Sequence, residues 1–149
     1  MKRIRRILHA TDYSRASERA LQEAVDLAKQ NKSELLVVHV IEPVAPYVSG
    51  EDFTGAELYL KLEETTKQDA QASMKKLMQR LGRLRIKAKS LLLKGTPYDQ
   101  IVRAAKNRKA DIIVIGTHGR TGLTKLFLGS VAGHVVSTAQ CPVLTVRGR

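Results

Sequence analysis

Apolar positions along the chain follow two alternating patterns, short continuous runs and longer stretches with helical spacing. The short runs predict strands covered on both faces, over residues 4–10, 35–41, 86–93, 111–116 and 141–146. Between them, apolar residues three and four positions apart predict helices over residues 14–30, 56–81, 97–107 and 128–139. Regular alternation of strand and helix favours an α/β fold, in which helices cover both faces of a parallel sheet.

The second predicted helix has the longest apolar stripe of the chain. Its core-facing positions are expected at Leu58, Leu62, Ala70, Met74, Leu77 and Leu81. Gly82 stands where a C-cap glycine would end this helix. Before the helix, residues 43–56 contain two prolines and two glycines and predict a long loop. Loops of that length often carry function.

The third predicted helix, over residues 97–107, has a clear start signal, and the fourth, over residues 128–139, has a clear apolar face. Thr96 as N-cap, Pro97 at the first helical position and Asp99 at the third predict the start of one helix. The last helix is expected to bury one face, formed by Val131, Ala132, Val135 and Val136.

Composition adds limits on the class of protein. The 149 residues are 43% hydrophobic and 27% charged, which suits one globular domain over residues 1–149. No apolar run is long enough to cross a membrane, and the short run after the basic first residues ends at His9, so no signal peptide is expected. Cys141 is the single cysteine, which excludes an intrachain disulfide. A soluble, cytoplasmic protein is expected.

The formal net charge of +12 is concentrated in one region. Residues 75–109 contain twelve lysines and arginines against Asp99 alone, whereas residues 1–74 have a net charge of −2. Such a region attracts an anionic partner or serves as a solvated surface.

A glycine-rich segment, residues 116–130, carries the clearest chemical signal. It lies between the end of a predicted buried strand and the start of a predicted helix, where open parallel sheets bind ligands. Glycines let a phosphate approach the backbone, and the free amide groups of a helix start bind it. The segment matches neither G-x-x-x-x-G-K-[ST] nor G-x-G-x-x-G. A glycine-rich turn without a ligand is the alternative.

The spacing of Gly116, Gly119, Gly129 and Ser130 resembles the nucleotide-binding motif of the ATP-binding branch of the universal stress protein family. Further segments also resemble that family, namely residues 7–14, 36–40, 110–120 and 141–146. The resemblance covers nearly the whole chain. It implies a Rossmann-like, adenine nucleotide alpha hydrolase-like sheet of five parallel strands in the order 3-2-1-4-5. Its switch point lies between the first and fourth strands.

The resemblance also implies a site for ATP, with Mg²⁺ inferred from the triphosphate. Asp12 would lie beside the adenosine or the metal-phosphate region, and the backbone of Val40 would line the adenine pocket. The amino end of the last helix would hold phosphate. The full expected set is Ala10, Thr11, Asp12, Val40, Ile115, Gly116, His118, Gly119, Arg120, Gly129, Ser130, Val131 and Ala132.

Other candidate residues favour structural roles. His9 and His39 lie on adjacent predicted strands and are expected to be packed and hydrogen-bonded, since the histidines lack zinc-ligand spacing. Cys141 and Met74 are expected in the core. The leading interpretation is a regulatory ATP-binding module of the stress response. A slow ATP-hydrolysing or phosphate-transferring enzyme is one alternative, although no base or nucleophile is evident.

Two kinds of macromolecular contact are predicted. The apolar last strand, Val143–Val146, would lie at a sheet edge, and the resemblance implies that it pairs with its copy in a homodimer. The region 75–109 would form a basic flank at the opposite edge, where it deters edge pairing or binds nucleic acid or an acidic protein. The cations expected there are Lys75, Lys76, Arg80, Arg83, Arg85, Lys87, Lys89, Arg103, Lys106, Arg108 and Lys109.

Overall fold

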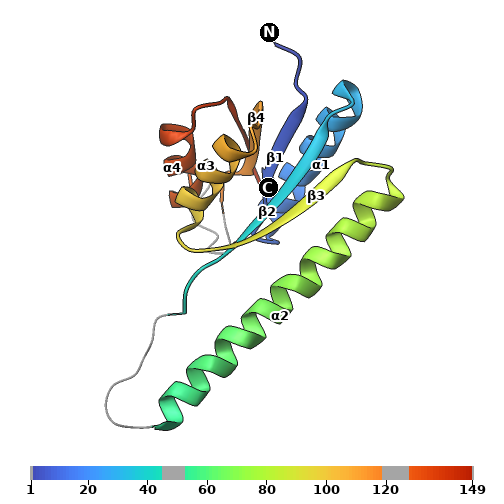
Figure 1. The fold of residues 1–149 in the computed structure, drawn as a ribbon. Coiled ribbons are helices and arrows are strands. Elements are labelled where there is room, and N and C mark those ends of the chain that lie inside the picture. The colour runs from blue at the N-terminus through green and yellow to red at the C-terminus, as the bar shows by residue number, and fades with distance from the viewer. Residues whose placement is uncertain (1, 45–52, 119–127, 149) are drawn as a thin grey trace.

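The computed structural model describes residues 2–44, 53–118 and 128–148. The strands are β1 (Arg6–Ala10), β2 (Glu34–Ile41), β3 (Ala88–Lys94), β4 (Ile112–Gly116) and β5 (Val143–Val146). The helices are α1 (Arg15–Asn31), α2 (Phe53–Arg83), α3 (Pro97–Asn107) and α4 (Ser130–Thr138). All four strand pairs are parallel, and the sheet order is β3-β2-β1-β4-β5 (Figure 1). The predicted fold class and strand order are therefore confirmed.

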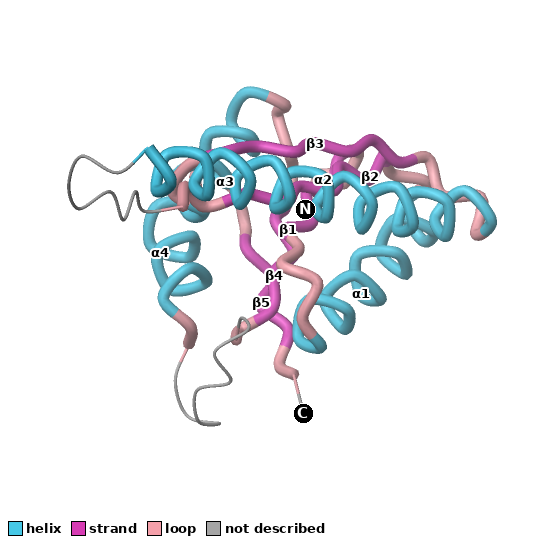
Figure 2. Tube along the Cα trace, turned by 90° about the horizontal axis from the view of Figure 1, so that it is seen from below, coloured by secondary structure: helices cyan, strands magenta, loops and turns pink. Residues whose placement is uncertain are grey.

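The central strands bury side chains on both faces of the sheet. On one face, Ile7, Leu35 and Val114 pack against α1 and α2. On the other, Leu8 and Ile113 pack against α3 and α4. Figure 2 shows α1 on one side of the strands and α3 and α4 on the other. This two-sided burial explains why the strands have continuous apolar runs rather than alternating ones.

The second helix differs from its sequence-based prediction at both ends. α2 begins at Phe53, inside the predicted loop, and continues through Gly82 to Arg83. Gly82 is thus not a C-cap, and the left-handed backbone conformation is adopted instead by Arg85, with φ of 57°. Leu58 and Leu62 were expected in the core but are 59% and 47% exposed.

The reason is the length of α2 relative to the sheet. In Figure 1 the amino-terminal part of the helix extends past the carboxyl ends of the strands, where no strand lies beneath it. The carboxyl-terminal part is buried on the sheet through Met74, Leu77 and Leu81, as predicted. Ala70 is also buried, at the cavity described below. Helical periodicity marks a face of the helix, but the neighbouring elements decide how far along that face burial extends.

The last helix also shows one difference. Ala132 and Val135 are buried as expected, whereas Val136 is 47% exposed. α4 runs only from Ser130 to Thr138, and the part of its surface that contacts α3 and β5 is narrow. The helix-start prediction at Thr96 and Pro97 is confirmed, although the Thr96 side chain makes no capping hydrogen bond.

Candidate functional site

A cavity of about 690 Å³ opens at the carboxyl ends of β1, β2 and β4. β1 pairs with β2 on one side and with β4 on the other, so the chain connections diverge here and leave a crevice. Ten of the residues expected at the site line this cavity: Ala10, Thr11, Asp12, Val40, Gly116, His118, Gly129, Ser130, Val131 and Ala132. Segments from opposite ends of the chain are thus brought to one place.

The remaining three expected residues do not line the cavity in the described structure. Ile115 is 5% exposed, packs in the core shared with α3 and α4, and is absent from the described lining of the cavity, so its place at the site stays a prediction. Gly119 and Arg120 lie outside the described residues.

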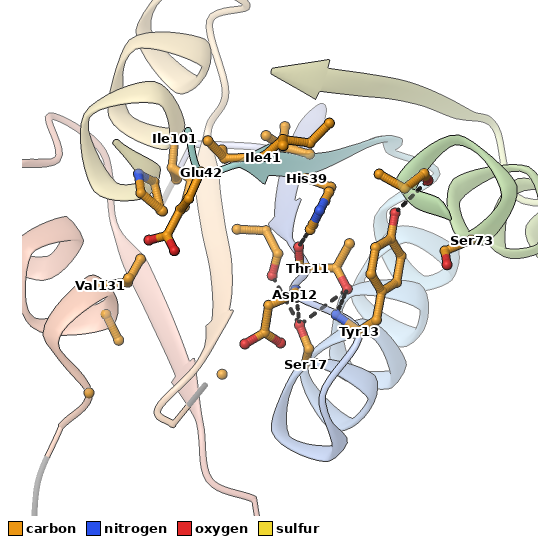
Figure 3. Close-up of a pocket in the computed structure, with 18 of the residues that line it drawn as sticks. Thr11, Asp12, Tyr13, Ser17, His39, Ile41, Glu42, Ser73, Ile101 and Val131 are labelled. Carbon is orange, nitrogen blue, oxygen red and sulfur yellow. Dashed lines mark hydrogen bonds between the residues drawn. The ribbon is translucent and has the colours of Figure 1, made fainter. Parts of the chain in front are cut away.

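A hydrogen-bond network holds the turn between β1 and α1 (Figure 3). The Asp12 amide donates to the Ser17 hydroxyl at 3.1 Å, and the Ser14 amide donates to the Asp12 carboxylate at 2.9 Å. The Tyr13 amide donates to the Thr11 hydroxyl at 3.0 Å. Tyr13 itself has a φ of 62°, which this network stabilises. The turn therefore holds Asp12 in place with its side chain toward the cavity.

His39 connects this turn to the neighbouring strand. Its Nδ1 lies 2.8 Å from the Thr11 carbonyl oxygen, which can only accept, so Nδ1 carries the proton. Its ring lies 4.6 Å from the Tyr13 ring, and the Tyr13 hydroxyl donates to the Ala70 carbonyl of α2 at 3.4 Å. The sequence-based prediction of a packed, hydrogen-bonded His39 is confirmed, and the contacts add a link between β2, the turn and α2.

The amino end of α4 forms another wall of the cavity. The Gly129 amide donates to the Thr117 carbonyl at 2.6 Å, and Gly129 is the N-cap residue. The next three amides, of Ser130, Val131 and Ala132, belong to the first helical turn and have no acceptor within the helix. They and the helix dipole provide a place for an anionic group.

The two described glycines of the motif are also required by the protein's own packing. A Cβ at Gly129 would lie 2.8 Å from the Thr117 carbonyl oxygen, and a Cβ at Gly116 would lie 2.9 Å from the Ala16 backbone carbon. The sequence predicts that these glycines allow a phosphate to approach the backbone closely. The structure shows that the protein's own backbone also leaves no room for a Cβ at either glycine. A substitution at these positions would therefore disturb the fold whether or not a ligand binds there.

The cavity has acidic side chains and a wall from α2 that the sequence did not reveal. Among its described lining residues are the carboxylates Asp12, Glu42 and Asp69, and no lysine or arginine. Asp69 comes from α2, as do Thr66 and Ser73. Figure 3 shows Asp12 and Glu42 directed into the cavity. Within the described ranges, no group of three or more His, Cys, Asp or Glu side chains is arranged to hold a metal ion.

Two residues outside the cavity have the structural roles expected of them. His9 is fully buried, and its Nδ1 lies 3.1 Å from the Val114 carbonyl oxygen. Cys141 is partly buried beside the core, and burial raises the pKa of its thiol, which disfavours the thiolate. In the described part of the chain, no helix has the length and apolar character needed to span a membrane.

Comparisons with known proteins agree with this architecture. A family model for the universal stress protein family matches residues 3–147. The chain belongs to the universal stress protein family. This universal stress protein is 43% identical over 141 residues to one from Thermus aquaticus, covering 95% of this chain and 97% of the relative. It is 36% identical over 143 residues to a universal stress protein from Methanocaldococcus jannaschii, covering 96% of this chain and 82% of the relative.

Solved structures of the family have the same fold. MJ0577 of Methanocaldococcus jannaschii superposes with a TM-score of 0.85 at 28% identity, and 99% of each chain is covered. A family member from Arabidopsis thaliana with AMP bound has a TM-score of 0.68 at 21% identity, covering 97% of this chain and 92% of that one. Some members of the family therefore bind adenine nucleotides.

Proposed function

We propose that this universal stress protein is a cytoplasmic, regulatory ATP-binding module of the stress response. The observation that carries the proposal is the 690 Å³ cavity at the switch point, with the amino end of α4 as one wall. The cavity brings Asp12, Val40 and Ser130 together from three separate parts of the chain. Relatives with AMP or cAMP bound support an adenine nucleotide as the ligand class.

The electrostatics of the cavity favour a nucleotide that arrives with a divalent cation. Three carboxylates line the described part of the cavity, and they oppose the binding of a bare triphosphate. Mg²⁺ bound to the phosphates would offset this repulsion, and Asp12 of the β1–α1 turn would be a carboxylate that could bind it. Magnesium usually binds through the substrate's phosphates and one or two carboxylates.

Calorimetry with matched tryptophan variants tests the proposal. Val131 lines the cavity, whereas Val136 lies on the same helix and is exposed. Val131→Trp should abolish ATP binding by filling the cavity, and Val136→Trp should leave it unchanged. Circular dichroism establishes that both variants fold. Unchanged ATP affinity in a folded Val131→Trp variant would show that the nucleotide does not occupy this cavity.

The choice of ligand is tested on the unmodified protein. Titrations with ATP, ADP and AMP, each with and without Mg²⁺, should give the tightest binding for ATP with Mg²⁺. A preference for AMP would contradict the role proposed for the amino end of α4. Following ADP release in the same samples separates a binding module from a slow ATP-hydrolysing enzyme.

A further inference from the structure

The amino ends of four of the five strands gather positive charge at the end of the sheet opposite the cavity. Because the sheet is parallel, the segments that enter β1, β2, β3 and β4 meet at that end, and Figure 1 shows the N-terminus and the turns into β2 and β3 there. We call this surface the basic pole. Its exposed cations are Lys2, Arg3, Arg5, Arg6, Lys32, Arg83, Arg85, Lys87, Lys89, Lys106, Arg108 and Lys109.

Contacts show that these segments adjoin one another. The Glu34 amide donates to the Arg5 carbonyl and the Asp111 amide donates to the Arg6 carbonyl, both at 2.9 Å. The Leu35 amide donates to the Lys87 carbonyl at 2.8 Å. A hollow of about 220 Å³ is lined by cations from three of the segments, Arg6, Lys89, Arg108 and Lys109.

The basic pole holds nearly all of the net charge of the protein. Its segments, residues 2–6, 32–34, 83–89 and 106–111, contain twelve cations and two carboxylates, a net charge of +10 out of +12 for the whole chain. Both carboxylates are already engaged. The Glu34 carboxylate lies 3.4 Å from the Lys87 Nζ and 3.5 Å from the Lys89 Nζ. The Asp111 carboxylate accepts hydrogen bonds from the backbone amides of Arg5 and Arg6. The other cations of the pole form no ion pair among the described residues.

Local stabilisation explains only part of this distribution. Lys32, Arg83 and Lys106 lie at the carboxyl ends of helices, where a cation is favourable for the helix dipole. Lysines on β3 protect a sheet edge from pairing. Residues 2–6 follow no helix and lead into the central strand β1, so neither reason accounts for their four cations.

We propose that the basic pole binds the phosphate backbone of double-stranded nucleic acid without regard to sequence. Interfaces with nucleic acid are polar and strongly positive, whereas protein interfaces have an apolar centre. Leu84 is the one large apolar side chain exposed within the segments of the pole. The same segments contain no aromatic residue, which disfavours a single strand held by base stacking. The acidic cavity at the other end leaves the nucleotide site clear of the bound polyanion.

Fluorescence anisotropy with a labelled mixed-sequence DNA duplex tests the proposal. If six to ten phosphates are contacted, affinity should fall by about 10³–10⁵ between roughly 50 and 200 mM salt. The triple variant Arg3→Gln/Arg85→Gln/Lys109→Gln should lower the slope of log affinity against log salt by about three. The control Arg15→Gln/Lys61→Gln/Lys67→Gln removes the same charge from exposed positions outside the pole and should keep the wild-type slope.

Several results would overturn the proposal. One is that the wild type does not bind the duplex at low salt. Another is that both triple variants lower the duplex affinity and its salt slope by the same amount. A third is that polyglutamate or anionic lipid vesicles bind more tightly than the duplex at equal charge concentration. Val131→Trp should bind the duplex as the wild type does. Loss of ATP binding therefore does not predict loss of duplex binding, and loss of duplex binding does not predict loss of ATP binding.

Discussion

At the scale of single residues, the buried imidazole of His9 is the most unusual group in the core. Its Nδ1 donates to the Val114 carbonyl, and its Nε2 has no hydrogen-bond partner among the described residues. Burial lowers the pKa of His9 to about 4, against smaller opposing effects of the Val114 hydrogen bond, Glu18 and Asp12. The folded protein therefore holds His9 neutral under conditions where the unfolded chain protonates it.

This residue predicts a loss of stability in mild acid. As the pH falls below about 6.5, the unfolded chain binds the His9 proton first, so the free energy of unfolding decreases until about pH 4. The full effect is about 3 kcal/mol. Urea unfolding of the wild type and of His9→Leu at several pH values measures it. The variant should lose less stability than the wild type in this range, and identical pH slopes would contradict the burial argument.

At the scale of elements, α2 combines a buried and an exposed part in one helix. Leu77 is 7% exposed on the sheet, whereas Leu62 is 47% exposed in the part that extends past the strands. Thr66, Asp69 and Ser73 lie between these two leucines and form a wall of the cavity. The stretch of α2 where burial gives way to exposure is therefore the part that lies alongside the candidate site.

The two parts should respond differently to the same truncation. Leu77→Ala should lower the free energy of unfolding by about 2–4 kcal/mol, because it leaves a void in the core. Leu62→Ala should change it by less than about 0.5 kcal/mol, because the side chain is half in water already. Chemical denaturation measures both. An equally large loss for Leu62→Ala would mean that this leucine is covered in solution.

At the scale of the whole molecule, the outer edge of β5 indicates how two copies would associate, because no strand of the described structure pairs with it. The Pro142 carbonyl accepts a hydrogen bond from the Ile113 amide of β4, and the Val146 carbonyl accepts one from the Thr117 amide just after it. Residues 142, 144 and 146 therefore direct their backbone groups inward. By alternation, Val143 and Thr145 direct theirs to the open edge. Leu144 is 38% exposed on this strand. An apolar strand with free amide groups is a template for pairing.

We predict a homodimer in which β5 pairs with its copy. Thr145→Pro removes one outward amide and should give a monomer, since proline is tolerated at a strand edge but cannot donate. Thr145→Val retains the amide and should remain dimeric. Light scattering at micromolar concentration distinguishes the two, and a monomeric wild type would contradict the prediction.

The order and type of every element in the described structure followed from the sequence. Apolar periodicity, Pro97 and the glycine-rich segment act over a few residues, so a local pattern suffices to place β1, β4 and the start of α3. The positions of Asp12 and Ser130 at the cavity were predictable for a related reason. Strand ends and helix starts meet at a switch point once the sheet order is known.

Tertiary packing alone decided the rest. The sequence does not show that α2 extends past the sheet and brings Asp69 to the cavity, because the reach of a helix depends on the size of the sheet beneath it. It does not show that residues 2–6 join residues 83–89 in one basic pole, since their proximity arises from strand pairing between distant segments. Local patterns are set by neighbours in the chain, whereas cavities and charged surfaces are set by neighbours in space.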